Sequence, residues 1–244
     1  MFLYFTRLWN ITIDLLFPPK PLVRELLRMD PFEFVSRADR SQNRAGKEIL
    51  SLFDYRDPLV REAVWELKYH GNKKIARLLA AMLYDEILAF LFEYAPLTHF
   101  TEPLLIPIPL SRARERERGF NQCELLVAEL IRLDVVSPIS PKKGSTAVLG
   151  RRGVAKNENV GLNFTLSLAL TKIKDTPSQT KAENRESRMK NLANCFSVKN
   201  PELIQGRNII LIDDVATTGA TLEEARRILR KAGARKVIAF TVAH

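Results

Sequence analysis

Two adjacent carboxylates followed by a loop of small and hydroxyl-bearing residues are the part of this sequence best suited to chemistry. Asp213 and Asp214 come directly after an apolar run, and residues 222–232 beyond the loop have helical character. The backbone N–H groups of such a loop can approach a phosphate closely, and a helix N-terminus adds positive potential there. Two adjacent carboxylates can accept hydrogen bonds from neighbouring sugar hydroxyls or hold a magnesium ion through water. The loop residues that we expect to contribute are Val215, Ala216, Thr217, Thr218, Gly219, Ala220 and Thr221.

This stretch resembles the phosphoribosyl pyrophosphate (PRPP) motif of type I phosphoribosyltransferases. The resemblance implies that Asp213 and Asp214 contact the ribose 2′ and 3′ hydroxyls, with Mg²⁺ as cofactor, and that residues 215–221 hold the 5′-phosphate of PRPP. An ordinary strand, turn and helix with a capping aspartate is the alternative for the stretch. The pairing of Asp-Asp with Thr-Thr-Gly-x-Thr is a much more specific signal for a PRPP site than a strand, turn and helix alone.

A basic segment after the apolar residues 104–109 forms a second cluster. Arginines near such a turn can bind pyrophosphate through bidentate hydrogen bonds, and the order along the chain fits the pyrophosphate loop of type I transferases. Glu115 and Glu117 alternate with the arginines, so part of this predicted loop is a solvated, self-paired surface. The candidates for the pyrophosphate side are Ser111, Arg112, Arg118, Asn121 and Gln122.

A polar segment at residues 175–191 precedes the motif strand and could act as a lid. Closing a lid excludes water, which would protect a reactive sugar cation from hydrolysis. An exposed loop without that role is the alternative. The lid candidates are Gln179, Thr180, Arg188 and Asn191.

Several segments in the same order are similar to the ComF family, phosphoribosyltransferase-like proteins associated with competence and DNA uptake. The similarity covers roughly residues 50–244, apart from an insertion at 137–160. It implies PRPP or a related ligand as substrate, and competence proteins or DNA as possible partners. It also adds Lys68 to the site candidates. The segments are residues 67–71 (Leu-Lys-Tyr-x-Gly), 106–110 (Ile-Pro-Ile-Pro-Leu), 118–122 (Arg-Gly-Phe-Asn-Gln), 179–191 and the Asp-Asp loop.

The sequence departs from that family at its N-terminus. Family members often carry a four-cysteine zinc module after a Leu-Leu-Phe-Pro-Pro stretch, and residues 15–19 have this stretch. The chain contains only Cys123 and Cys195, however, so we expect no zinc site of this kind. In the lid segment, Ala182 stands where a leucine is usual, and Arg-x-x-Asn is displaced by one residue.

The elements that position these residues alternate between apolar strands and amphipathic helices. We therefore expect an α/β fold of the type I phosphoribosyltransferase-like class, with a mainly parallel sheet and helices on both faces. Ligands bind at the carboxyl ends of the strands in such sheets. Residues 162–173 are ambiguous between strand and helix. The predicted strands are residues 51–55, 104–109, 195–198, 209–212 and 236–243, and the predicted helices are residues 22–29, 58–70, 73–94, 121–132 and 222–232.

With 244 residues, the chain is long enough for one large domain, residues 51–244, and a short helical N-terminal extension, residues 1–50. Residues 1–17 predict an amphipathic helix that docks on protein, because Arg7 and Asp14 make them a poor membrane span. They also lack signal-peptide features. Two distant cysteines suggest a reducing compartment, so we expect a cytoplasmic protein without a transmembrane segment.

The net charge of +10 suggests an anionic ligand or partner, although a solvated basic surface is an equal alternative. A catalytic protein would transfer the phosphoribosyl group from PRPP to an acceptor and release pyrophosphate. A non-catalytic accessory protein for DNA uptake, using the pocket to sense a ligand, is the alternative. A single-strand binding module requires aromatic side chains among its basic residues, and the arginine run offers only Phe120 nearby. The sequence has no P-loop motif, which argues against a helicase.

Overall fold

The computed structural model describes residues 20–41, 48–136, 162, 164–174 and 194–244. The predicted N-terminal helix and the insertion at residues 137–160 lie outside this part of the chain. So do the lid candidates Gln179, Thr180, Arg188 and Asn191. These expectations stay predictions.

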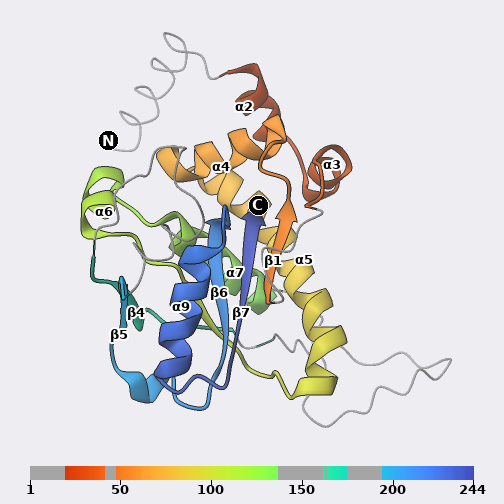
Figure 1. The fold of residues 1–244 in the computed structure, drawn as a ribbon. Coiled ribbons are helices and arrows are strands. Elements are labelled where there is room, and N and C mark those ends of the chain that lie inside the picture. The colour runs from red at the N-terminus through yellow and green to blue at the C-terminus, as the bar shows by residue number, and fades with distance from the viewer. Residues whose placement is uncertain (1–19, 42–47, 137–161, 163, 175–193) are drawn as a thin grey trace, which may run out of the picture.

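A five-stranded parallel sheet forms the centre of the protein, in the order β1-β7-β6-β2-β3 (Figure 1). The longest strands, β6 and β7, lie side by side, and both are almost wholly buried. Strands covered on both faces are expected to read as continuous apolar runs, as these two do. The strands are β1 (Ile49–Phe53), β2 (Leu104–Pro107), β3 (Thr165–Leu166), β6 (Asn208–Val215) and β7 (Lys236–Ala243).

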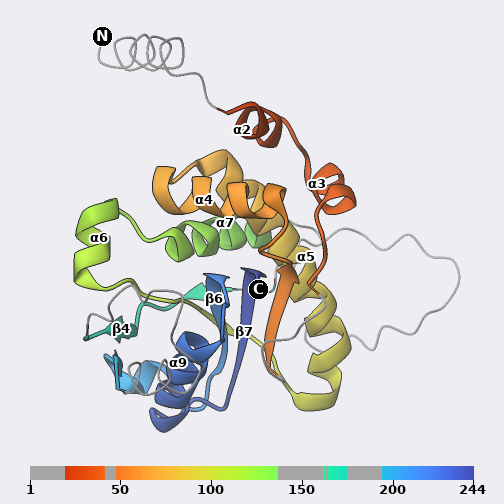
Figure 2. The same ribbon diagram turned by 45° about the horizontal axis from the view of Figure 1, so that its top comes forward.

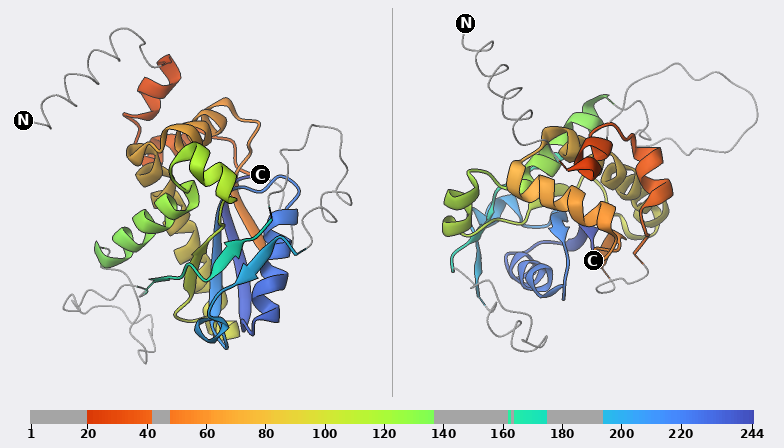
Figure 3. Two further views of the ribbon diagram at one scale, coloured as in Figure 1. Left: turned by 90° about the vertical axis from the view of Figure 1, so that its left-hand side faces the viewer. Right: turned by 90° about the horizontal axis from the view of Figure 1, so that it is seen from above.

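Helices cover both faces of this sheet, which confirms the predicted fold class. On one face α5 (Lys73–Thr98) and α7 (Gln122–Val136) pack together, and on the other face lies α9 (Ala220–Lys231) (Figure 3). Strand β6 contributes to both cores because successive side chains of a strand point to opposite faces. Ile210 and Ile212 belong to the core with α5 and α7, whereas Leu211 belongs to the core with α9.

Strand β6 continues beyond the predicted end at residue 212. Its ladder with β7 pairs Asp213 with Thr241 and Val215 with Ala243, so the aspartates belong to the strand itself. The prediction ended the strand at residue 212, where the apolar run ends, and placed the aspartates between the strand and the loop. Backbone pairing with β7 decides the actual end, at the carboxyl edge of the sheet.

The helix α4 (Pro58–His70) lies above this edge (Figure 2). Asp57 caps it by accepting hydrogen bonds from the N–H groups of Leu59 and Val60, at 2.7 and 3.1 Å. Gly71 ends it in the left-handed conformation, with φ of 57°. These two ends confirm the predicted helix at residues 58–70.

The basic segment after β2 is a helix, α6 (Arg112–Arg118), so the predicted loop is wrong here. The sequence of α6 lacks the apolar periodicity that identifies most helices, because no residue of this helix is buried against the core. Its ends account for the helix. The Ser111 side chain accepts a hydrogen bond from the N–H of Arg114, and Gly119 ends the helix with φ of 76°.

The ambiguous residues 162–173 contain two strands, β3 and β4 (Leu170–Lys172). Strand β4 pairs antiparallel with β5 (Phe196–Val198) in a separate two-stranded sheet, beside a 3-10 helix, η1 (Pro201–Leu203). The predicted strand at residues 195–198 is therefore real but lies outside the main sheet. Strands this short carry no periodicity that could assign them to a sheet.

Two short helices precede β1, namely α2 (Pro21–Leu26) and α3 (Pro31–Arg37). The first was predicted, and the second was not. Leu26 and Phe34 belong to the same core as Phe53 of β1, with the two phenylalanine rings 5.3 Å apart. The division of the chain at residue 50 stays a prediction. Within the described residues, no helix has the length and apolar character needed to cross a membrane.

Candidate functional site

The acid pair at the end of β6 is buried and partly hydrogen-bonded. Oδ1 of Asp213 accepts hydrogen bonds from the N–H of Asp214 at 2.9 Å and from the Cys123 thiol at 3.3 Å. Oδ1 of Asp214 accepts from the N–H of Val215 at 2.7 Å. Its other oxygen, Oδ2, is buried and accepts no hydrogen bond from any residue that the structure describes. That oxygen is paired instead with the ammonium group of Lys68.

Lys68 of α4 supplies the charge that faces this oxygen. Its Nζ lies 3.2 Å from Oδ2 of Asp214, and its side chain is 22% exposed against 4% for the aspartate. Burial lowers the pKa of Lys68, but attraction by Asp214 and Asp213 outweighs it, so the pKa lies above the ordinary value. Lys68 is thus a stable ammonium group next to the acid pair.

Asp213 is the strongly perturbed acid of the site. Burial, followed by repulsion from Asp214, raises its pKa to about 7, and the charge of Lys68 opposes this rise. The ionised pair is therefore unfavourable by itself near neutral pH. A ligand that brings a cation, or hydroxyl groups that donate hydrogen bonds, would stabilise it.

The loop after the acids leads directly to the N-terminus of α9. The N–H of Ala216 donates to the carbonyl of Ala243 at 2.9 Å, which fixes the start of the loop to the end of β7. Gly219 takes the left-handed conformation, with φ of 73°, and α9 begins at Ala220. Thr217 is exposed, and the hydroxyl of the half-buried Thr218 accepts a hydrogen bond from the N–H of Ala220 at 3.4 Å. The first N–H groups of a helix have no partner within the helix, which suits an anion.

The residues predicted for the pyrophosphate side have different tasks. Asn121 is buried, donates to the carbonyl of Ile108 at 3.1 Å, and accepts from the N–H of Cys123 at 2.9 Å. It therefore holds the start of α7 against the end of β2. Arg118 donates to Oε1 of the buried Gln122 at 3.0 Å, whereas Arg112 is exposed at the start of α6. Ser111 is buried as the cap of α6.

Two family-like segments, residues 67–71 and 118–122, meet in space. The Arg118 guanidinium lies over the Tyr69 ring, 5.1 Å from its centroid, and the Phe120 ring packs against Gly71. These contacts join α4 to the segment between α6 and α7. Lys68, which contacts Asp214, is therefore next in the chain to a residue that contacts the predicted pyrophosphate side. Among the described residues, no ion pair or hydrogen bond joins the arginines of α6 to the acids.

Cys123 is a site residue that was not among the candidates from the sequence, where the two cysteines served only to exclude a zinc site and to suggest a reducing compartment. One ligand atom from each of Cys123, Asp213 and Asp214 lies within 4.8 Å of the others. Burial raises the pKa of the Cys123 thiol well above its ordinary value, so it is protonated. Mg²⁺ prefers oxygen ligands. The two carboxylates therefore supply ligand atoms that fit Mg²⁺, and the thiol does not.

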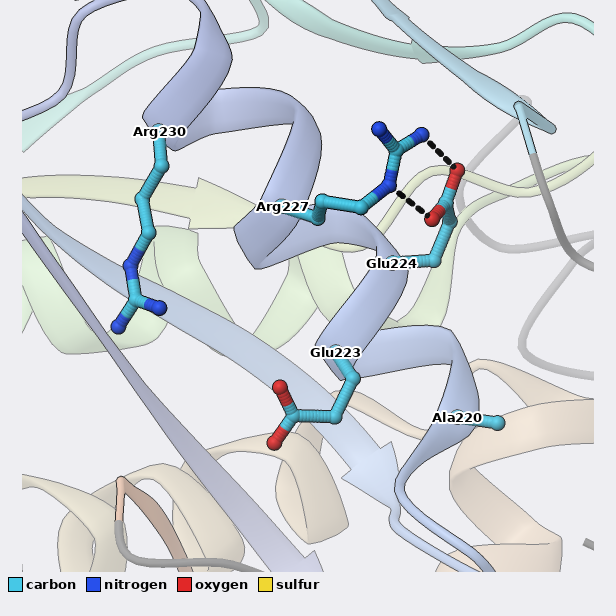
Figure 4. Close-up of a pocket in the computed structure, with 5 residues that line it drawn as sticks. All are labelled: Ala220, Glu223, Glu224, Arg227 and Arg230. Atoms are coloured by element: carbon cyan, nitrogen blue, oxygen red, sulfur yellow. Dashed lines mark hydrogen bonds and ion pairs between the residues drawn. The ribbon is translucent and has the colours of Figure 1, made fainter. Parts of the chain in front are cut away.

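A separate surface pocket lies on the solvent side of α9 (Figure 4). Glu224 accepts two hydrogen bonds from Arg227, at 2.7 and 2.9 Å, and Arg230 is paired with Glu48. These charges neutralise one another within the protein. The pocket is lined by Ala220, Glu223, Glu224, Arg227 and Arg230, and so does not include the acid pair.

Residues 152–244 match the family described as the phosphoribosyl transferase domain. The chain is 34% identical over 194 residues to the competence protein ComFC of Bacillus subtilis (strain 168), a match that covers 79% of this chain and 62% of ComFC. It is 29% identical over 192 residues to the DNA utilization protein YhgH of Escherichia coli (strain K12), covering 78% and 69% of the two chains. The chain thus spans less than two thirds of the length of ComFC.

Solved structures with a similar arrangement include hypoxanthine phosphoribosyltransferase from Trypanosoma cruzi with the product IMP. It has a TM-score of 0.36 and 9% identity, over 70% of this chain and 64% of that chain. Glutamine PRPP amidotransferase from Bacillus subtilis with ADP and GMP has a TM-score of 0.35 and 12% identity, over 73% and 30% of the chains. The family match and the parallel sheet together show a type I phosphoribosyltransferase-like fold, and the chain is similar in sequence to ComFC and YhgH.

Proposed function

We propose that this protein binds PRPP with Mg²⁺ at the acid pair and transfers its phosphoribosyl group to an acceptor. The observation that carries the proposal is the buried pair Asp213 and Asp214 at the carboxyl edge of the sheet, followed directly by the turn into α9. This edge is where ligands bind in open α/β sheets. The relatives named for competence and DNA utilization leave the acceptor open.

In this proposal the ribose hydroxyls donate hydrogen bonds to the carboxylates, and the 5′-phosphate accepts them from the turn at residues 215–221. The bond between the anomeric carbon and the pyrophosphate oxygen breaks, and its electron pair leaves with pyrophosphate. A nucleophile of the acceptor forms the new bond to that carbon and loses its proton. When bound, Mg²⁺ supplies positive charge to the leaving group. Burial of the acids keeps water from screening these interactions.

Calorimetry tests this proposal through PRPP binding with and without Mg²⁺. We expect binding that depends on Mg²⁺ and that Asp213→Asn combined with Asp214→Asn weakens at least tenfold, since both acceptors lose their charge. Asp85→Asn, an exposed acid of α5, is the matched control and should bind as the wild type does. A folded wild-type protein that does not bind PRPP would rule the proposal out.

We propose single-stranded DNA binding on α4 and α6 as a second function, because exposed aromatic side chains meet basic side chains there. Trp65 and Tyr69 are 40% and 51% exposed, with ring centroids 5.0 Å apart. Arg118 lies over the Tyr69 ring and Lys20 over the Trp65 ring, each 5.1 Å from the centroid. Aromatic faces that stack with bases, beside cations for the backbone, are what a single-strand site requires. The sequence offered only Phe120 near the arginines, and folding supplies the other rings from α4.

Fluorescence anisotropy with a labelled oligothymidine tests this second function. Trp65→Ala combined with Tyr69→Ala should weaken binding about tenfold or more, because each stacked base contributes about 1–3 kcal/mol. Phe92→Ala, at a ring 50% exposed on α5, is the control and should leave binding unchanged. Equal affinities of the double variant and the control would exclude this surface.

A further inference from the structure

We propose that Lys68 is a built-in cation that competes with a divalent metal ion for Asp214, so that the metal ion binds well only together with the anionic ligand. The contact that motivates the proposal is the 3.2 Å approach of Nζ to Oδ2 of Asp214. That oxygen is buried and accepts no hydrogen bond from the described residues. It is also the carboxylate oxygen at which a metal ion would have to replace Lys68 as the partner. The inference rests on the function proposed above for this pocket.

The backbone of Lys68 is held firmly while its side chain can reorient. The capping by Asp57 fixes the start of α4, and the packing of Phe120 on Gly71 fixes its end. The ammonium group sits on a four-carbon stem and is partly exposed. Tyr69 and Gly71, one and three residues beyond Lys68, contact Arg118 and Phe120 at the predicted pyrophosphate side. A pyrophosphate group there would attract the ammonium group away from the acid.

The charges explain why the metal ion and Lys68 should exclude each other in the empty pocket. An ammonium and a divalent cation at one buried oxygen repel strongly, since little water separates them. The acid pair already has Lys68 as its counter-charge, with Nζ 3.2 Å from Oδ2 of Asp214. A phosphorylated ligand adds negative charge, gives Lys68 a second partner, and leaves Asp214 to the metal ion. Metal ion and ligand should then strengthen each other's binding by equal factors, as linkage requires.

Binding of Mn²⁺ without any other ligand, followed by electron paramagnetic resonance, tests the proposal. Lys68→Met should bind Mn²⁺ about tenfold more tightly than the wild type, because one competing charge next to the acid is gone. Lys68→Arg keeps the charge and should bind as weakly as the wild type. Lys73→Met removes an exposed lysine of α5 and is the matched control. Mn²⁺ should also raise the melting temperature of Lys68→Met more than that of the wild type.

Lys68→Gln serves if Lys68→Met does not fold, because its amide can still donate to Asp214 without carrying charge. Mn²⁺ binding by the neutral variant that is no tighter than that of the wild type and of Lys73→Met would overturn the proposal. Adding PRPP separates this inference from the proposed function. Tighter Mn²⁺ binding by Lys68→Met, with no effect of PRPP on the wild type, would support the competing cation while rejecting PRPP as the ligand.

Discussion

The ring of Phe120 packs so closely on Gly71 that a Cβ atom at the glycine would lie 3.0 Å from Cζ of the ring. Gly71 ends α4, and Phe120 lies between α6 and α7, so this contact joins two segments that are far apart in the sequence. It fixes the end of α4 three residues beyond Lys68, and thereby the place from which the ammonium reaches Asp214.

Gly71→Ala should therefore destabilise the protein by about 2–3 kcal/mol, through strain at positive φ and through the contact with the ring. Chemical denaturation monitored by circular dichroism measures this change. Gly206→Ala is the matched control, because Gly206 has φ of 71° but a Cβ atom there meets nothing within 4 Å. We expect it to cost about 1 kcal/mol, from the backbone alone. Equal losses in the two variants would show that the ring contact contributes nothing.

The raised pKa of Asp213 should make stability depend on pH. The folded protein holds a proton up to about pH 7, whereas an unfolded aspartate releases it near its ordinary pKa of 3.8. Since the folded state then binds more protons, this group's contribution to stability is present at low pH and is lost as pH rises from about 4 to 7. Asp213→Asn removes this loss, which is at most about 4 kcal/mol for a shift of this size.

Denaturation of the wild type and of Asp213→Asn at pH 5 and pH 8 measures the effect. The free energy of unfolding of the variant, relative to that of the wild type, should be larger at pH 8 than at pH 5. An equal difference at the two pH values would contradict the raised pKa of Asp213. Mg²⁺ and PRPP require the ionised acid, so their affinity for the protein should rise as pH increases through 7. The free energy of unfolding should change in the opposite direction over the same range.

Both cysteines should resist alkylation in the folded protein. Cys123 and Cys195 are buried, and burial raises the pKa of each thiol, so little thiolate is available to react. Mass spectrometry after iodoacetamide treatment at pH 8 should find both unmodified in the native protein and modified in denaturant. Rapid native labelling of Cys123 would contradict its position behind Asp213.

Asp134 should be important for stability, although it is far from the acid pair along the chain. It is buried and accepts hydrogen bonds from the Tyr84 hydroxyl at 3.2 Å and from the N–H groups of Leu162 and Phe164 at 2.6 and 2.9 Å. Asp134→Ala leaves these donors unsatisfied and should cost about 2–4 kcal/mol in thermal or chemical denaturation. The exposed Asp85→Asn should cost less than about 0.5 kcal/mol. If Asp134→Ala lost as little stability as Asp85→Asn, Asp134 would not be an anchor for residues 162 and 164.

Local sequence determined much of the fold, and it also determined the part of the site formed by the acid pair and the turn into α9. The continuous apolar runs of β6 and β7 indicated buried parallel strands, and Asp57 with Pro58 indicated the start of α4. These features depend on burial pattern and on capping, which act over a few residues. The acids and the turn into α9 are likewise contiguous, so their proximity follows from the chain itself.

Only the tertiary structure decided which other groups meet the acids. Lys68 comes from α4 and Cys123 from α7, and neither stands near the acids in the sequence. Packing of those helices on the sheet brings them together, and no local pattern encodes that contact. The helix α6 escaped prediction because its ends, rather than an apolar face, define it. The aromatic partner of Arg118 was equally hidden, since Tyr69 reaches it through the close packing of Phe120 on Gly71.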